Sequence, residues 1–249
     1  MARAAREVVE TNGLSVVEVV ECKVEDLQLP PGSVDVIVSE WMGFHLVNES
    51  MLDSVLFARD RFLAPGGIMI PGAVRLLAAP AQVDEEVNFW IDPSKTGGLD
   101  MSSLMRLAVA ERCTIPSIEI VNPDCLLAAP QVAAQWNLHS ITREDARRIS
   151  AMLSFDTTKA GTLTSLVLWF DTDIGLDCSP FSPPTHWKQT VVSLETYVEV
   201  SVRQPITCEL VLEQEPLSTR HYSCTIDFKG FDGHELDCDC FKCQLVRGE

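Results

Sequence analysis

Two glutamates, Glu40 and Glu49, stand at either end of the stretch EWMGFHLVNE. Glu40 follows the apolar run VDVIV, and Glu49 precedes a segment with helical spacing, so the stretch between them can fold back and bring both carboxylates together. Because bare negative charges repel, two carboxylates at one site share a proton or bind a cation. A planar guanidinium cation can be held by paired hydrogen bonds. The alternative is that Glu40 is an ordinary loop residue and Glu49 a carboxylate favoured by a helix dipole.

The elements that must position these glutamates follow an α/β order over residues 1–71. Alternating helix and strand patterns of this kind indicate a sheet with parallel strands. The run VDVIV is typical of a strand buried on both faces. The expected elements are a helix at Ala2–Glu10, strands at Ser15–Glu21 and Val34–Val38, a helix at Ser50–Leu63 and a strand at Ile68–Pro71.

After Pro71 the pattern changes to short β-rich segments separated by turns, which predicts an antiparallel β domain over residues 72–249. Residues 84–122 fit neither pattern and suggest an excursion from that domain. The expected strands are Val74–Ala79, Thr164–Asp171, Thr190–Arg203, Ile206–Glu213 and His221–Asp227.

The 249-residue chain is strongly acidic, with 19 Lys and Arg against 36 Asp and Glu and a formal charge of −17. Binding to a nucleic-acid backbone needs clustered positive charge, so we expect no direct nucleic-acid partner. The same field favours encounters with basic partners. The N-terminal sequence has no apolar signal-peptide core and no apolar run approaches a membrane span, so we expect no membrane contact and a cytoplasmic or nuclear location.

Two separated motifs carry a specific resemblance. Ser39–Leu52 reads SEWMGFHLVNESML, followed by DSVLFARDRFLAPGG, and Pro184–Thr190 reads PTHWKQT. These strings resemble the protein arginine methyltransferases, which transfer a methyl group from S-adenosylmethionine to an arginine guanidinium. The resemblance extends to TIDFKG near the C-terminus, and the pattern is similar to the type I members, which make asymmetric dimethylarginine.

The resemblance implies that Glu40 and Glu49 hold the substrate guanidinium and that Met42 and Met51 line the cavity around the reacting methyl group. For the methionines, filling of an apolar core is the alternative. Two fixed carboxylates can draw positive charge away from one guanidinium nitrogen, which leaves that nitrogen able to attack the sulfonium methyl group. Positioning and electrostatics then supply most of the catalysis.

The resemblance also implies that His186 and Trp187 close the arginine pocket from the β domain and that Val24 and Glu25 contact the adenine of the cofactor. Glu49, or a relay through His186, could accept the proton late in the reaction. Without the resemblance, His186 would be a structural histidine, and the segment KVED would be a charged turn.

By resemblance, residues 1–71 form the C-terminal half of a Rossmann-like methyltransferase domain, and residues 72–249 form an antiparallel β-barrel with a dimerisation arm at about 84–122. The arm implies a homodimer, and Trp90, Leu99, Met101 and Leu104 are its candidate contacts; capping of the barrel is the alternative. Arginine-rich substrates such as histones or RNA-binding proteins are implied by the resemblance alone.

A further expectation concerns the site that would bind the methyl donor. No G-x-G pattern precedes Glu40, so the resemblance implies an incomplete donor site in this chain. Two hypotheses stay open: the chain is a methyltransferase, or it is a non-catalytic shortened paralogue or isoform that dimerises and binds a partner.

Cys238, Cys240 and Cys243, with His234, could ligate zinc. Because strand side chains alternate, one face of a final strand also explains Cys238 and Cys240, and we expect no metal.

Overall fold

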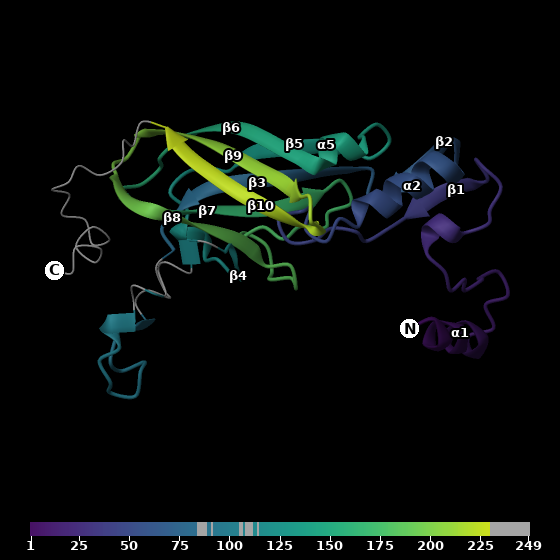
Figure 1. Cartoon of the computed structure of the whole chain (residues 1–249), viewed down its shortest axis with the longest axis horizontal. Coiled ribbons are helices and arrows are strands. Elements are labelled where there is room, and N and C mark those ends of the chain that lie inside the picture. Colours follow the sequence, from purple (N-terminus) through teal and green to yellow (C-terminus); the bar gives the residue numbers. More distant parts are fainter. Residues whose placement is uncertain (84–88, 91, 105–106, 108–111, 114, 230–249) are drawn as a thin grey trace.

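Figure 1 shows the computed structural model, which describes residues 1–83, 89–90, 92–104, 107, 112–113 and 115–229. The α/β part lies at one end, the β strands fill the centre, and residues 92–104 project to one side. Within these described ranges, no helix is long and apolar enough to cross a membrane.

The N-terminal part contains the expected parallel pair of strands. Strand β1 pairs in parallel with β2, with Val36 opposite Ile68, and α2 connects the two strands. The predictions of α1, β1, α2 and β2 are therefore confirmed. The elements are α1 (Ala2–Thr11), η1 (Val24–Asp26), β1 (Val34–Val38), α2 (Leu52–Phe62) and β2 (Leu63–Ile70).

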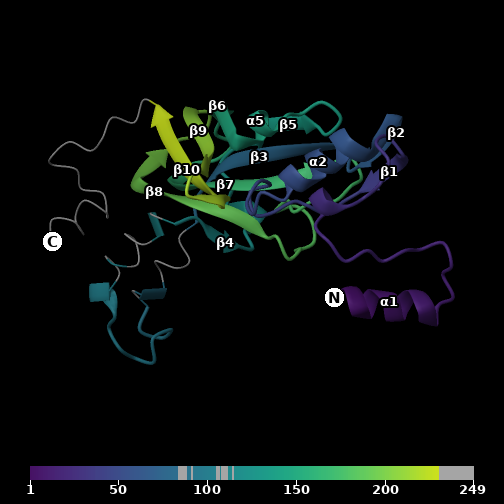
Figure 2. The ribbon, with the colours of Figure 1, turned by 45° about the vertical axis from the view of Figure 1, so that its right-hand side comes forward.

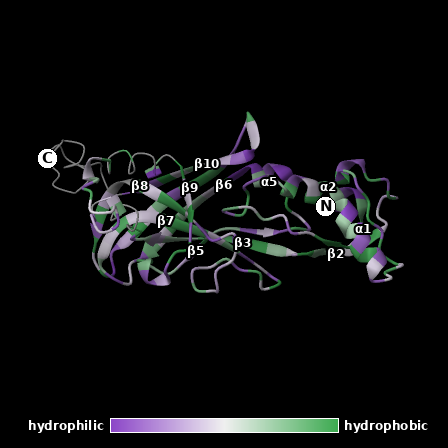
Figure 3. Cartoon of the chain, turned by 90° about the horizontal axis from the view of Figure 1, so that it is seen from below, coloured by the Kyte–Doolittle hydropathy of each residue, from purple (hydrophilic) through white to green (hydrophobic). Residues whose placement is uncertain are grey.

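The strand expected at Ser15–Glu21 is wrong. Its β-branched residues have no partner strand among the described residues, and Val16 is exposed. β-branched composition favours a strand only where a neighbouring strand and a packing surface are present. Figures 1 and 2 show α1 lying apart from the rest of the chain at the end of this extended segment, and in Figure 3 the helix carries both hydrophobic and hydrophilic residues.

The expectation that Val34–Val38 is buried on both faces is also wrong. Val38 is 72% exposed and Val36 is 43% exposed. In the described part of the chain, β1 has β2 as its one ladder partner, so it forms the edge of a two-stranded sheet. The strand itself was predictable from its apolar run, but its burial depends on neighbours that such a run does not specify.

Two antiparallel sheets make up the second part of the chain. One has the strand order β4-β8-β7-β3-β5, and the other has the order β10-β9-β6. The five strands expected here are confirmed as β3, β7, β8, β9 and β10. The bounds are β3 (Ala73–Ala81), η2 (Ser102–Leu104), β4 (Ser117–Glu119), η3 (Pro123–Cys125), β5 (Gln131–Asn137), α5 (Arg143–Arg147), β6 (Arg148–Asp156), β7 (Gly161–Thr172), β8 (Gln189–Val200), β9 (Pro205–Glu215) and β10 (Ser218–Lys229).

The core lies between these two sheets. Every residue of β7 from Leu163 to Phe170 is buried, while β9 alternates and turns Cys208, Leu210 and Leu212 inward. The two sheets share no ladder in the described residues, so a closed barrel stays a prediction.

The helix α2 ties the N-terminal part to the β strands. Arg59 Nη1 donates hydrogen bonds to the carbonyl oxygens of Leu138 and Ile141 at 2.8 and 2.7 Å. Both acceptors lie in the loop between β5 and α5. Because hydrogen bonds that involve a charged group are stronger than neutral ones, this contact holds α2, and the residues just before it, against the β domain.

Candidate active site

A pocket of about 200 Å³ lies where the two parts meet. It brings together six of the eight site residues expected from the sequence. Two segments form it: the glutamate loop, defined here as residues 39–51, and the Thr-His-Trp loop, residues 184–188. The pocket is lined by Glu40, Trp41, Met42, Gly43, Phe44, Glu49, Met51, His186 and Trp187.

The glutamate loop folds back on itself at Gly43. The backbone groups of Gly43 and Leu46 exchange two hydrogen bonds of 3.0 Å. A Cβ atom at Gly43 would lie 1.9 Å from the carbonyl oxygen of Asn48, so only glycine permits this approach. This reversal places Glu40 and Glu49, at the two ends of the loop, on the same pocket.

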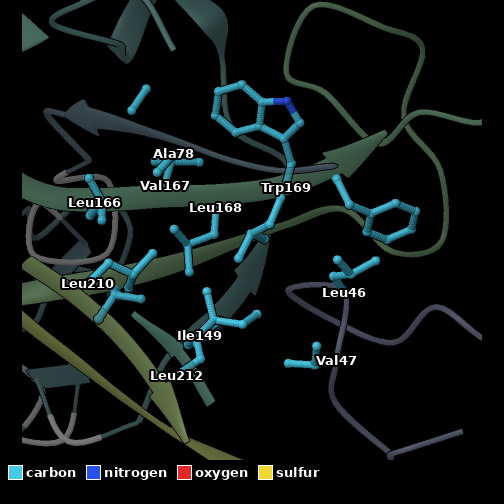
Figure 4. Close-up of a cluster of buried hydrophobic side chains, with 14 of the residues drawn as sticks. Leu46, Val47, Ala78, Ile149, Leu166, Val167, Leu168, Trp169, Leu210 and Leu212 are labelled. Carbon is cyan, nitrogen blue, oxygen red and sulfur yellow. The ribbon is translucent and has the colours of Figure 1, made fainter. Parts of the chain in front are cut away.

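The middle of the glutamate loop is anchored in the core of the β domain. Leu46 and Val47 are almost fully buried and belong to the same cluster of buried side chains as Ile149 and Leu212, which Figure 4 shows on the same side of β7. Burial of two apolar side chains contributes on the order of 3–6 kcal/mol at about 1.5–3 kcal/mol each. The loop that carries both glutamates is therefore held by apolar packing from within.

The Thr-His-Trp loop closes the pocket from the β domain. The buried indole of Trp187 donates a hydrogen bond from Nε1 to the carbonyl oxygen of Met42 at 2.7 Å. Its ring meets Phe170 edge-on with centroids 5.3 Å apart, and His186 lies over it at 3.9 Å. Trp187 thus joins the two loops, and His186 remains exposed at the pocket.

Glu49 already contacts a guanidinium group. Arg220 Nη2 lies 3.3 Å from Glu49 Oε2, and the backbone N–H of Glu49 donates to the carbonyl oxygen of Arg220 at 2.7 Å. Both side chains are more than half exposed. Arg220 lies 171 residues further along the chain, and no local signal in the sequence indicated this contact.

The two methionines occupy different environments. Met42 is buried and forms the inner wall, whereas Met51 is 47% exposed at the start of α2. The alternative that the methionines fill an apolar core therefore holds in part for Met42, although Met42 also lines the pocket. Met51 is too exposed for core filling to explain why it lines the pocket.

Val24 and Glu25, which the resemblance places at the cofactor's adenine, are not among the residues that line this pocket. They lie in η1 beside α2, where Ser54 Oγ donates to Glu25 Oε1 at 2.7 Å. This hydrogen bond lowers the pKa of Glu25 below its ordinary value, which keeps the exposed carboxylate ionised.

His45 is a feature of the glutamate loop that our sequence reasoning missed. Its two ring nitrogens are buried and have no hydrogen-bond partner among the described residues. Burial lowers the pKa of His45 to about 4, because the charged imidazolium is disfavoured away from water. The imidazole is therefore neutral at pH 7.

The pocket's chemistry suits a flat cation. Two carboxylates supply negative charge and hydrogen-bond acceptors, while the rings of Trp41, Phe44 and Trp187 line the same cavity. Such rings attract cations placed over their faces. The volume is below the roughly 300–1,000 Å³ of pockets that enclose drug-sized ligands, so this pocket has room for a group about the size of one side chain.

Comparisons with known proteins point to one family. The family described as the arginine methyltransferase oligomerization subdomain matches residues 75–232, and a methyltransferase domain matches residues 1–67. Protein arginine N-methyltransferase 6 of Xenopus tropicalis is 32% identical over 241 residues, covering 92% of this chain and 70% of that protein. Protein arginine N-methyltransferase 2 of Homo sapiens is 33% identical over 244 residues, covering 92% and 55%.

Solved structures give the same result. The PRMT1 enzyme–prozyme heterotetrameric complex with AdoHcy from Trypanosoma brucei has a TM-score of 0.76 at 26% identity, covering 91% of this chain and 77% of that one. A crystal structure of PRMT6 has a TM-score of 0.75 at 26% identity, covering 92% and 82%.

The fold and the site define a methyltransferase with an appended antiparallel β domain. The chain belongs to the protein arginine methyltransferase family, so the resemblance seen in the sequence is confirmed. The matched oligomerization subdomain also indicates that members of this family assemble through the β-rich part.

Proposed function

We propose that this chain binds the arginine of a substrate protein between Glu40 and Glu49 and takes part in its methylation. The observation that carries the proposal is the ion pair of Glu49 with Arg220: the pocket's second carboxylate already accepts a guanidinium in this structure. Both glutamates line the same small pocket. Carboxylates bind guanidinium groups through directed, charge-assisted hydrogen bonds.

The other pocket residues have roles that follow from their positions. Two carboxylates concentrate the positive charge of the guanidinium on the nitrogens they touch, which leaves one terminal nitrogen able to attack. Met42 and Met51 line the space around that nitrogen. Glu49, or a relay through His186, which is exposed at the pocket, accepts the proton late in the reaction. Trp187 holds the Thr-His-Trp loop against Met42.

S-Adenosylmethionine supplies the methyl group when it is bound. Val24 and Glu25 would face its adenine. The ionised, solvent-exposed carboxylate of Glu25 fits this role, since it can accept a hydrogen bond from an amino group. The structural neighbour from Trypanosoma brucei is a complex with AdoHcy.

The charge of −17 supports arginine-rich protein substrates, because a strongly acidic surface attracts basic chains and speeds their encounter. Substrates of this kind, such as histones or RNA-binding proteins, would be met in the cytoplasm or nucleus. The division into residues 1–71 and 72–249, with the latter closing into a barrel, remains part of the proposal.

Residues 84–122 would form a dimerisation arm. The support comes from the described part of this segment, where apolar side chains that could pack against a second copy face solvent: Phe89, Leu99 and Leu104. Exposed apolar side chains on a segment that projects from the rest of the fold would be covered if a second copy packed against it. The proposed assembly is a homodimer.

The test is transfer of a labelled methyl group from S-adenosylmethionine to an arginine-glycine peptide. Glu49→Gln removes the charge that holds the guanidinium and is expected to lower turnover about 100-fold or more, the usual cost of removing one charge-stabilising group. Glu213→Gln is the matched control, because Glu213 is equally exposed and also pairs with an arginine, Arg148, at 2.8 Å.

Each outcome decides something. Turnover in the unaltered chain that Glu49→Gln leaves unchanged would contradict the role of Glu49. No turnover in the unaltered chain, together with dimerisation in sedimentation, would favour the non-catalytic partner-binding hypothesis. Loss of turnover in Glu49→Gln with normal turnover in Glu213→Gln would support the proposal.

A further inference from the structure

The backbone at the end of the glutamate loop is in an unusual conformation. Glu49 has φ 77° and Ser50 has φ 54°, and neither residue is glycine. Consecutive non-glycine residues in the left-handed region cost free energy and persist only where the surrounding contacts hold them. The contacts that hold this step therefore decide where the carboxylate of Glu49 lies.

Within the glutamate loop, the N–H of Ser50 donates to the carbonyl oxygen of Val47 at 3.2 Å. The contacts from outside the loop come from the β9–β10 hairpin, defined here as residues 214–220. The N–H of Glu49 donates to the carbonyl oxygen of Arg220 at 2.7 Å, and the hydroxyl of Ser50 donates to the carbonyl oxygen of Thr219. Gln214 joins both sides: its Nε2 donates to Ser50 Oγ at 2.9 Å and to the carbonyl oxygen of Thr219 at 2.8 Å. Figure 1 shows the start of β10 directed toward the N-terminal part of the chain.

We propose that the β9–β10 hairpin supports the substrate site from outside the pocket and that Gln214 is a positioning residue for Glu49. This inference rests on the proposed function, since it assumes that Glu49 binds the substrate guanidinium. Gln214 does not touch the substrate. It holds Ser50, and through Ser50 the strained backbone that carries the carboxylate.

The geometry explains why one amide could matter. Paired hydrogen bonds to a guanidinium require a carboxylate fixed in position and angle, and a misplacement of about 1 Å in a site costs up to 100-fold in rate. Glu49 is more than half exposed, so packing alone does not fix its side chain. One hydrogen bond of Gln214 restrains the neighbouring Ser50 through its hydroxyl, and the other, to the carbonyl oxygen of Thr219, fixes Gln214 within the hairpin.

The experiment measures binding of a glycine-arginine-glycine peptide to the full chain by calorimetry. Gln214→Met keeps the length of the side chain and removes both hydrogen bonds, and it is expected to weaken binding about fivefold. The matched control is Gln204→Met. Gln204 lies directly before the first residue of β9, at the end of the strand away from the hairpin. Its side chain also makes a hydrogen bond, accepting from the N–H of Ser201 at 2.8 Å.

Ser50→Gly provides a second variant, which adds no backbone strain at position 50 because glycine adopts φ 54° freely. It removes the hydroxyl that Gln214 holds and is also expected to weaken binding. A double-mutant cycle then separates positioning from general destabilisation. In a Glu49→Gln background, Gln214→Met should have no further effect on peptide binding, since the group it positions is altered.

The outcomes distinguish the inference from the proposed function. If Glu49→Gln binds the peptide as tightly as the unaltered chain, the proposed function is wrong. If Glu49→Gln weakens binding but Gln214→Met behaves like Gln204→Met, the positioning role is wrong. The positioning role is also wrong if Gln214→Met weakens peptide binding equally in the unaltered chain and in the Glu49→Gln background. In that case the effect would not depend on the carboxylate of Glu49.

Discussion

The hydrogen bond from Trp187 Nε1 to the carbonyl oxygen of Met42, 2.7 Å long, joins the Thr-His-Trp loop directly to the glutamate loop. Trp187→Phe removes the indole N–H but keeps an aromatic ring that can still meet Phe170 edge-on. The buried carbonyl of Met42 would then lose its indole partner. The substitution thus isolates one hydrogen bond and a modest loss of ring volume.

The magnitude follows from two contributions. Leaving a buried acceptor unsatisfied costs about 1–3 kcal/mol. The smaller ring leaves a partial cavity, which adds about 1 kcal/mol because full truncation of a buried aromatic residue costs about 3–5. The free energy of unfolding should therefore fall by about 2–4 kcal/mol, a large part of the roughly 5–15 kcal/mol of a typical domain.

Urea unfolding followed by circular dichroism measures this change, provided that the slope with denaturant stays the same. Trp136→Phe is the control: Trp136 is half-buried on β5 and stands opposite Val74 in the ladder. Its cost should stay near 1 kcal/mol, since no buried acceptor among the described residues loses a hydrogen bond from its indole. Equal losses in the two variants would refute the reasoning, because the Met42 hydrogen bond would then contribute nothing measurable.

Two further predictions concern charge. The pKa of His45 is lowered to about 4, so the unfolded chain, with a value near 6.5, binds the proton first; stability should fall as pH drops from about 6.5 to 4, by up to about 3 kcal/mol. His45→Leu should flatten that slope in urea titrations at several pH values, and an unchanged slope would contradict it. Arg220→Ala removes the cation already on Glu49, an exposed pair worth about 0.2–1 kcal/mol, so methylguanidinium should bind up to about fivefold more tightly in NMR titrations. Weaker binding of methylguanidinium would contradict this prediction, because Arg220 would then assist binding at Glu49 instead of competing for its carboxylate.

Much of the fold followed from local patterns. The apolar run Val34–Val38 and the β-rich segments after Pro71 identified strands because their side chains suit a pleated, packed surface. β5 (Gln131–Asn137) escaped because its Gln, Ala and Asn residues carry little β-propensity, and tertiary pairing with β3 decides its structure. Ser15–Glu21 failed for the opposite reason, since favourable residues without a neighbour do not make a strand.

The site divides in the same way. Six of the residues that line the pocket could be predicted, because the two motifs that carry them resemble those of the protein arginine methyltransferases. Arg220 and Gln214 could not, since each reaches the glutamate loop across more than 160 residues of sequence. Such contacts depend on how the β9–β10 hairpin packs against the N-terminal part. Neither the hydrophobic periodicity nor the residue spacing of the sequence indicates that packing.

The central claim is that Glu40 and Glu49 together hold the arginine of a substrate. The most direct measurement is a crystal structure of this chain with a glycine-arginine-glycine peptide. Our account predicts the peptide's guanidinium in the pocket, within hydrogen-bond distance of both carboxylates, with the Arg220 side chain moved from Glu49. A guanidinium bound elsewhere, with Arg220 still paired to Glu49, would contradict it.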